Sequence, residues 1–394
     1  MASGLLPRGI VVLGFVSMLM DTSSEMIHGL LPVFLVSVLG ASTLAVGIIE
    51  GIAEATAAIT KVFSGAFSDW IGRRKLLVLA GYGLSALSKP LFPLATSVGA
   101  VVAARFIDRT GKGVRGAPRD ALIADLTPPE KRGSAYGLRQ SLDTVGAVAG
   151  PAIALALMAF TGGDFHLVFW IASVPAFLAV ALIVVGVQEP EGLRRAVDRR
   201  FPIRRDELRR LATTYWLMVA FAAVLTLARF SEAFLLLRAS NVGLAATWVP
   251  AILIVMNVVY AVAAYPFGRL SDNASRRTLL ALGIGFLIAA DIVLAAADSV
   301  WMVAVGAILW GLHMGATQGL LTAIVADTAP DDLRGTAFGV FNLITGVVLL
   351  AASVLAGELW SAVGPATTFL AGAAFSVLAL GGLMALRIRR VDGG

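Results

Sequence analysis

Long apolar runs, each of about 20 residues, recur along the whole of this 394-residue chain, and short charged breaks separate them. About 20 consecutive apolar residues are what an α-helix needs to cross the ~30 Å hydrocarbon core of a bilayer. The spanning alternative, a β-barrel, requires segments of about ten residues that alternate apolar and polar, and the sequence lacks that pattern. Only 14% of the residues are charged, whereas a soluble protein has about 25%. We therefore predict an all-α integral membrane protein.

Counting the runs predicts twelve transmembrane helices. Their expected ranges are 9–37, 42–68, 75–95, 98–124, 134–160, 165–187, 212–239, 245–268, 278–297, 300–325, 336–362 and 365–388. The arginine-rich stretch 188–211 is too charged to cross a bilayer, and we interpret it as a cytoplasmic linker. The prediction is thus an N-terminal six-helix bundle (1–187), the linker and a C-terminal six-helix bundle (212–394).

Lys and Arg are concentrated in one alternate set of the expected loops, and the other set has almost none. Because basic residues are enriched in cytoplasmic loops, this asymmetry places both termini in the cytoplasm. It also accounts for the net charge of +6 without nucleic-acid binding. The first apolar run continues past any signal-peptide cleavage point, so we expect it to be the first spanning helix. The absence of cysteine excludes disulfides and thiolate metal sites, and no cofactor or metal is expected.

Two charged loop motifs occur once in each half of the chain. Gly65–Leu77 and Gly268–Leu280 share Gly, Ser, Asp, Arg, Arg, Leu and Leu at the same spacing. Ala124–Gly137 and Ala326–Gly339 form the second matching pair. A duplicated membrane domain is the simplest explanation. Since each copy has an even number of helices, the copies run parallel, as in transporters that rock two bundles around a central site.

These motifs resemble those of the major facilitator superfamily, and the resemblance covers essentially the whole chain. The first loop resembles the family signature Gly-x-x-x-Asp-x-x-Gly-Arg-Arg/Lys, whereas its second copy has Ser275 at the second glycine position. A family arginine followed by a glycine step has a counterpart in Arg105 or Arg109 with Gly111. The region around Ser24-Glu25 resembles a prokaryotic branch of the family. The resemblance implies a secondary transporter that works by alternating access.

The fifth expected helix carries a spaced set of helix-breaking residues. Gly137, Gly146, Gly150 and Pro151 resemble the signature of the family's proton-coupled exporters, without its trailing Gly-Gly. The glycines would let another helix approach closely, and the proline removes one helix hydrogen bond. A packing groove with no coupling role is the alternative interpretation.

The resemblance also implies that the charged loops latch the cytoplasmic side shut. Asp69 would pair with a loop arginine or with the start of the expected helix 336–362, since a helix N-terminus favours negative charge. Pseudo-symmetry gives Asp272 the equivalent role in the second half. The candidate latch residues are Gly65, Asp69, Gly72, Arg73, Arg74, Asp125, Arg132, Gly268, Asp272, Arg276, Arg277, Asp327 and Arg334.

Ionisable residues within the expected spans are the candidates for function, because each costs at least about 2.5–3.5 kcal/mol at mid-membrane unless it is paired or hydrated. The expected helix 98–124 is the extreme case, with a stripe of Arg105, Asp108, Lys112, Arg115 and Arg119 at steps of three and four. Such a stripe must face the bundle or a central cavity. Either Asp108 merely neutralises Arg105 or Lys112, or Arg105 or the flanking Arg109 contacts substrate or the proton path.

The first expected helix contains two acids, Asp21 and Glu25, at about 16 and 22 Å along its axis and hence near mid-membrane. They share one face, which His28 continues. Burial raises the pKa of a carboxylate in general and a nearby cation lowers it, so an acid whose neighbours change could bind and release a proton. The alternative is a static ion pair with the arginines of 98–124.

These predictions give two sets of candidate residues. The proton-coupling candidates are Asp21, Glu25, Glu54, Asp108 and Asp143. The substrate-cavity candidates are His28, Arg105, Arg109, Arg139, Arg229, Glu232 and His313. Arg139 and Asp143 are four apart and can satisfy each other, and a lone mid-helix histidine such as His313 is more often packed than functional.

The sequence therefore predicts a multi-pass transporter in the inner membrane of a prokaryote, acting as a monomer on a small organic solute. Export coupled to protons is the favoured interpretation. Import by a proton symporter or a facilitator, of a solute that could be anionic, is the alternative. An enzyme is not expected, because nucleophile and base sets are missing and the three histidines are scattered. The chain has no P-loop for ATP and no ring of polar residues for a channel.

Overall fold

The computed structural model describes residues 7–71, 73–127, 132–188, 208–273, 275–328 and 334–385, and the regular structure in these ranges is all helical. The first half contains α1 (Arg8–His28), α2 (Leu31–Ser37), α3 (Thr43–Ile71), α4 (Arg74–Ser88), η1 (Lys89–Leu91), α5 (Val98–Leu126), α6 (Arg132–Phe160) and α7 (Phe165–Gly186). The second half contains α9 (Thr213–Ala228), α10 (Ala233–Asn241), η4 (Ala246–Trp248), α11 (Pro250–Asn273), α12 (Arg276–Ala296), α13 (Val300–Thr328), α14 (Arg334–Ala362) and α15 (Pro365–Ala385).

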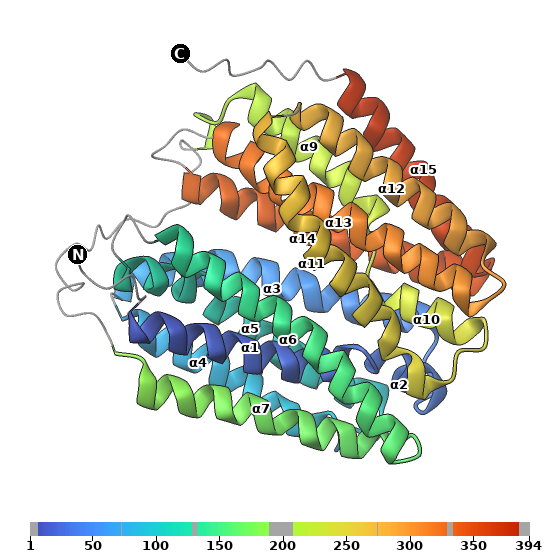
Figure 1. The fold of residues 1–394 in the computed structure, drawn as a ribbon, viewed down its shortest axis with the longest axis horizontal. Helices are drawn as coiled ribbons and strands as arrows, with labels where there is room; N and C mark the ends of the chain where they lie inside the picture. The colour runs from blue at the N-terminus through green and yellow to red at the C-terminus, as the bar shows by residue number, and fades with distance from the viewer. Residues whose placement is uncertain are drawn as a thin grey trace.

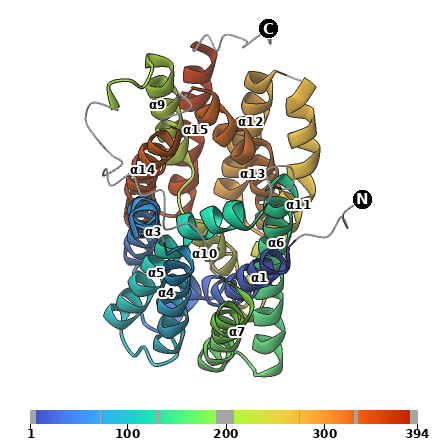
Figure 2. The same ribbon diagram turned by 90° about the vertical axis from the view of Figure 1, so that its left-hand side faces the viewer.

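Helices α1 to α7 form one half of the molecule and α9 to α15 the other (Figure 1). The most extensive packing between the halves involves two helix pairs: α3 packs along α14, and α6 packs against α11 (Figure 2). Ten helical segments in the described ranges are long and apolar enough to cross a membrane. The segment α4–η1 and helix α5 fall outside that set, since α4 is only 15 residues long and α5 carries many charges. The prediction of an all-α membrane fold with two bundles is confirmed.

The helix ends lie on two opposite faces of the molecule. One contains the start of α1 and the arginines of the α3–α4 and α11–α12 turns (Arg73, Arg74, Arg276 and Arg277), and we call it the basic face. The opposite loops, 38–42, 92–97, 161–164, 242–245, 297–299 and 363–364, contain no Lys or Arg, and we call this side the charge-poor face. The predicted linker lies largely outside the described residues, which resume at 208.

Equivalent turns on the charge-poor face show the internal repeat in the backbone. Gly163 between α6 and α7 and Gly364 between α14 and α15 have φ values of 95° and 128°, which glycine adopts far more readily than other residues. Their amides donate to the carbonyls of Met158 (2.9 Å) and Leu359 (3.1 Å), so each closes the preceding helix in the same way.

The predicted helix ranges agree with the structure to within about five residues, but two predicted helices are broken. The first breaks at Gly29–Leu30, just before Pro32, which cannot donate a helix hydrogen bond. The seventh breaks between Ala228 and Ala233. There the hydroxyl of Ser353 accepts from the Ser231 amide (3.3 Å), so a side chain replaces a helix bond at membrane depth.

The second halves of the broken helices, α2 and α10, lie side by side near the charge-poor face (Figure 1). Close by, α3 and α14 approach through glycines: a Cβ atom on Gly51 would lie 2.7 Å from Leu350. The hydroxyls of Thr43 and Ser361 are 2.7 Å apart across the same seam. The two halves are therefore in direct contact on this side.

The apolar core has a different extent on each side of the molecule. On the charge-poor side one cluster includes residues of both halves, such as Phe34 and Phe169 from the first and Phe230 and Trp310 from the second. On the basic side the cores are separate, one around Tyr82 and the other made of Leu211, Tyr215, Val219, Val325 and Ala337. The halves are thus sealed together at the charge-poor face and parted toward the basic face.

Candidate functional site

Two adjoining cavities lie between the halves. The outer cavity, of about 470 Å³, extends toward the basic face and includes Lys61, Arg119 and Gln140 in its wall. The inner cavity, of about 310 Å³, lies deeper and reaches the break between α9 and α10. The two share Glu25, Glu54, Lys112, Ala147 and Asn257 in their walls. Together they form a polar opening to mid-membrane from the basic side.

Ion pairs hold the first-half wall of the inner cavity, which Glu50 and Arg109 line, whereas Arg105, predicted to line it, is buried behind Glu50 and lines neither cavity. Arg105 of α5 lies 2.7 Å from Glu50 of α3, and both side chains are about 2% exposed or less. His28 bridges two acids, with Nδ1 3.3 Å from Glu25 and Nε2 3.7 Å from Glu50. Arg109 lies 3.2 Å from Glu54, whose side chain is more exposed to the cavity. Most charges of this wall are therefore already paired within the protein.

The predicted charge stripe of α5 divides between two neighbouring helices. Arg105 and Arg109 face α3, as just described, whereas Asp108 binds Lys89 of η1 at 2.9 Å and Arg115 donates to Ser85 of α4. Asp108 therefore pairs with Lys89 rather than with Arg105 or Lys112. Lys89 is not among the predicted site residues, although a lysine inside an apolar run indicates a buried partner.

Arg115 and Arg119 extend the α5 network toward the basic face. The Arg115 guanidinium lies 4.7 Å from the centre of the Tyr82 ring, a cation–π distance. Arg119 donates to the Ser17 hydroxyl at 2.9 Å and lies 3.3 Å from Asp120. These contacts tie α5 to α1 and α4.

Asp21 differs from the other acids of the first half. It lines the outer cavity, and its carboxylate has no hydrogen bond or ion pair within the described residues. The neighbouring acid Glu25 is bonded to His28, and on the adjacent helix α6 Arg139 pairs with Asp143 at 2.5 Å. The alternative in which both helix-1 acids are held statically by the α5 arginines does not match this arrangement.

The glycines of α6 pack beneath the two acids of α1. A Cβ atom on Gly146 would lie 3.1 Å from the Asp21 Cβ, and one on Gly150 would lie 2.7 Å from the Glu25 Cβ. The close helix approach expected from the glycine spacing is therefore present, and α1 is the partner. Pro151 lies inside α6, and the surroundings of Gly137 lie outside the described residues.

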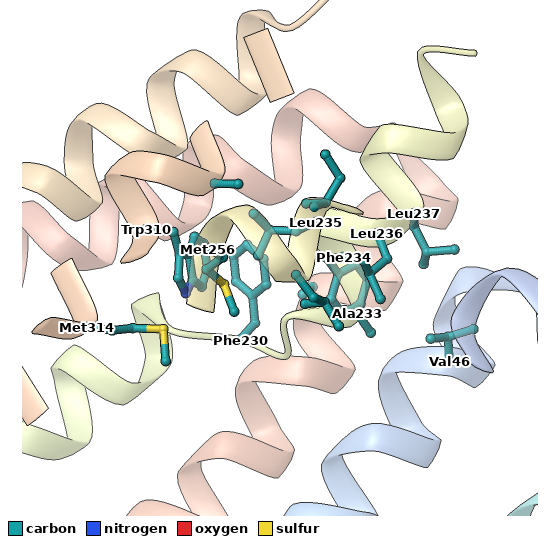
Figure 3. Close-up of a cluster of buried hydrophobic side chains, with 14 of the residues drawn as sticks. Val46, Phe230, Ala233, Phe234, Leu235, Leu236, Leu237, Met256, Trp310 and Met314 are labelled. Carbon is teal, nitrogen blue, oxygen red and sulfur yellow. The ribbon is translucent and has the colours of Figure 1, made fainter. Parts of the chain in front are cut away.

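The break between α9 and α10 forms the second-half wall of the inner cavity. Arg229, Phe230, Ser231 and Glu232 all line it, together with Trp310 of α13. The rings of Phe230 and Trp310 pack edge to face at 5.7 Å, within the aromatic and methionine cluster that Figure 3 shows. Placing Arg229 and Glu232 at this cavity agrees with the sequence prediction.

Uncharged polar groups from the second half complete the outer cavity, and the sequence analysis did not single them out. They are Asn257 and Tyr260 of α11, Gln318 of α13 and Asn342 of α14. The Tyr260 hydroxyl donates to Gln318 at 3.0 Å, and the Asn257 amide reaches the Ala147 carbonyl of α6 at 3.4 Å. In the sequence these residues are distinguished only as isolated polar side chains within apolar runs.

Two buried polar residues of the second half lie away from the cavities. His313 is fully buried, and its Nδ1 is 2.8 Å from the Gly283 carbonyl, so it faces the contact of α13 with α12. His313 therefore lines neither cavity, contrary to the prediction for it, and is instead a packed histidine between α13 and α12. Asp291 of α12 is also fully buried, and neither carboxylate oxygen has a hydrogen-bond partner among the described residues.

Part of the predicted latch can be placed. Arg74, at the start of α4, lies 2.8 Å from Asp125 near the end of α5, so this ion pair joins the basic-face ends of α4 and α5. Arg277 of α12 donates to the Met384 carbonyl of α15, and Arg73 is exposed. Gly65 packs near Ala117 of α5. Outside the described residues lie Gly72 and the side-chain surroundings of Asp69, Arg132, Gly268, Asp272, Asp327 and Arg334.

Comparisons with known proteins agree with this architecture. The family model described as Major Facilitator Superfamily matches residues 13–255 and 233–393. An uncharacterized MFS-type transporter of Methanocaldococcus jannaschii, MJ1317, is 32% identical over 392 residues, which cover 97% of this chain and 95% of the relative. The multidrug resistance protein MdtH of Edwardsiella ictaluri is 31% identical, over 49% of this chain and 47% of its own.

Among solved structures, the nucleoside transporter NupG superposes with a TM-score of 0.79. The match covers 95% of this chain and 99% of NupG at 14% identity, so it concerns the fold alone.

Proposed function

This chain belongs to the Major Facilitator Superfamily, and we propose that it exports a small organic solute in exchange for protons. The basic face is cytoplasmic in this proposal, because Lys and Arg are retained on that side of membranes. The cavities then face the cytoplasm, from which an exported solute must be collected. The protein resides in the inner membrane of a prokaryote with both termini inside, and a single chain holds the complete cavity. No enzymatic step is invoked.

The observation that carries the proton-coupled mechanism is the placement of Asp21. Its carboxylate lines the outer cavity midway along α1, and no described residue binds it. An unpaired acid at such a depth is costly unless it is hydrated or protonated. It can therefore exchange a proton with water in the cavity, whereas Glu25, Glu50 and Asp143 are each engaged by a cationic or histidine partner.

The exchange cycle follows from this arrangement. When solute enters from the cytoplasm, Asp21 loses its proton, which leaves to the cytoplasm through the same opening. After the halves rock, the cavity faces outward, the solute departs and Asp21 takes up a proton. The packing of Gly146 against α1 keeps α6 close to Asp21, so the movement of either helix changes the surroundings of the acid.

The relatives support export in a limited way. MdtH, which matches half of this chain, is named a multidrug resistance protein, and drug resistance by transport requires efflux. The matched relatives of full length carry no substrate in their names.

The test uses everted membrane vesicles, whose cytoplasmic face is outward and whose lumen is acidified by respiration. A panel of labelled organic solutes is added outside, and proton-driven accumulation is measured with and without a protonophore. We expect accumulation of at least one solute in the wild type and its loss in Asp21→Asn, which should retain solute counterflow. The matched control is Asp164→Asn on the charge-poor face, where the side chain only caps α7.

Three outcomes contradict parts of the proposal. Wild-type accumulation by Asp21→Asn would exclude Asp21 as the proton carrier. Accumulation only in right-side-out vesicles with an acidic exterior would establish the symporter alternative. Uptake that a protonophore leaves unchanged in both orientations would indicate a facilitator.

A further inference from the structure

Three charged groups in the inner cavity lack an internal partner. The pairs Glu25–His28, Glu50–Arg105 and Glu54–Arg109 account for most of the charges there. Lys112 of α5, together with Arg229 and Glu232 at the break between α9 and α10, makes no hydrogen bond or ion pair with any described residue. Arg229 and Glu232 attract each other without bonding directly, so two cations and one acid keep their bonding groups open to whatever fills the cavity.

The unpartnered groups come from both halves of the molecule. Lys112 belongs to the first half, whereas Arg229 and Glu232 belong to the second, and all three border one cavity of about 310 Å³. Charges at membrane depth are costly when they have neither a partner nor water. A ligand that offers an anion to the two cations and a cation to the acid would satisfy all three together.

We propose that the substrate is a small amphoteric molecule with an anionic group, an amine and an apolar body. The anionic group lies between Lys112 and Arg229, and the ammonium lies at Glu232. The apolar body lies against Phe230 and Trp310, which border the same cavity. This inference rests on the proposed function, since it assigns the cavity to a transported solute.

The alternative anion site is the arginine stripe of α5, and the structure argues against it. Arg105 is 2% exposed and bonded to Glu50, and Arg109 is bonded to Glu54. An anion there would have to displace the buried carboxylate of Glu50 or the partly exposed one of Glu54, and breaking the buried pair costs several kcal/mol. Lys112 and Arg229 can receive an anion without breaking any internal ion pair.

The inner cavity adjoins the outer one, so its volume bounds only the part of the solute that lies at the three charged groups. About 310 Å³ is at the lower end of the range for small-molecule pockets, roughly 300–1,000 Å³. A single aromatic or branched aliphatic body with two charged ends fits such a space better than an extended drug.

The test is binding of three matched probes to the purified full-length chain in detergent, by isothermal titration calorimetry. The probes are para-(aminomethyl)benzoate, para-methylbenzoate and para-methylbenzylamine, which carry both charges, the anion alone and the cation alone. We expect the amphoteric probe to bind at least about tenfold more tightly than either of the others, as the loss of a charge-assisted contact predicts.

Variants assign each charge of the probe to its partner. Lys112→Met and Arg229→Met should each lower the affinity for the two carboxylate-bearing probes by about tenfold and leave the affinity for para-methylbenzylamine undiminished. Glu232→Gln should instead lower the affinity for the two amine-bearing probes. Lys112→Arg keeps the charge and should keep the preference, and Lys61→Gln changes a lysine of the outer cavity alone. All variants are first checked for a wild-type elution profile and unfolding temperature.

The result that overturns the inference is equal or tighter binding of para-methylbenzylamine by the wild type, or no binding of the amphoteric probe up to millimolar concentration. The inference would also be overturned if Lys61→Gln lost as much affinity for the carboxylate-bearing probes as Lys112→Met does. Vesicle transport separates this inference from the proposed function. Proton-driven transport of cations alone would leave the exporter intact and reject the amphoteric substrate, whereas charge-specific binding without proton-driven transport would do the reverse.

Discussion

The two halves of this molecule share a fold but treat buried charge in opposite ways. In the described part of the first half, most buried charges are joined into pairs, such as Glu50–Arg105 and Lys89–Asp108, and the charges left without a direct partner, Asp21 and Lys112, line the cavities. In the described part of the second half, Asp291 is fully buried with both oxygens unpartnered. Duplication therefore preserved the helices and their turns, while the internal electrostatics of the two copies diverged.

The buried arginine of the second half illustrates the same contrast. Arg238 of α10 binds no carboxylate and instead donates to the carbonyls of Leu294 (3.0 Å) and Ala297 (2.5 Å) at the end of α12. It thereby fastens the segment after the helix break to its own bundle, since cations favour a helix C-terminus. Among the described residues, ion pairs join helices of the first half, whereas in the second half Arg238 joins α10 to α12 through backbone carbonyls; apolar clusters stabilise both halves.

The largest expected effect comes from breaking an ion pair of the first half. Arg105→Met leaves the buried Glu50 with His28, at 3.7 Å, as its remaining direct partner, and removing one partner of a buried pair costs about 3–5 kcal/mol. We expect the free energy of unfolding, measured by denaturant titration in detergent micelles, to fall by that amount.

The double variant Glu50→Gln/Arg105→Met is the matched control. It removes both charges, so it should recover a large part of the loss. An Arg105→Met protein as stable as the wild type would show that the ion pairs do not hold the first half together, and the contrast between the halves would fail.

The opposite sign is expected for the second half. Asp291→Leu removes a carboxylate whose oxygens lack partners, and a buried unsatisfied polar group costs about 1–3 kcal/mol. The apolar replacement should therefore raise the free energy of unfolding by a similar amount, in the same denaturant assay. Gly372 limits the available space, since a Cβ atom there would lie 2.8 Å from the Asp291 carboxylate.

Asp291→Asn distinguishes charge from shape at this site, because it keeps the size of the side chain. A stabilised Asn variant with an unchanged Leu variant would point to crowding around Gly372. Destabilisation by both would mean that the carboxylate has a favourable role in the folded protein, and the halves would then be more alike than proposed.

The sequence was sufficient for the architecture because membrane helices follow from composition and length. The apolar runs predicted the helix ranges closely, and the repeated loop motifs predicted the parallel halves. The breaks near Gly29 and Arg229 were not predicted. Average hydropathy is insensitive to them, since both spans stay apolar on average even though Arg229 and Glu232 lie in the second break. At that break the Ser353 hydroxyl satisfies the exposed amide of Ser231.

Many charged residues that line the cavities could be predicted, but not their pairing or the uncharged polar residues of the second half. Helical spacing placed the charges of α5 on one side, yet that side is wide enough to face both α3 and α4. Whether Asp108 bonds Lys89 or Arg105 depends on the rotation and neighbours of α5, which a single sequence leaves undetermined. Asp291 was overlooked because it has no charged neighbour in the sequence to draw attention to it.

The smallest expected effect concerns an ion pair of the first half that is partly exposed. Arg74 and Asp125 lie 2.8 Å apart, but their side chains are 16% and 20% exposed at the basic face. Water and salt screen such a pair, and exposed pairs contribute about 0–1 kcal/mol. We expect Arg74→Gln to lower the free energy of unfolding by less than about 1 kcal/mol, with the difference shrinking at high salt. If the loss instead equalled that of Arg105→Met and resisted salt, the number of ion pairs rather than their burial would explain how the first half differs from the second.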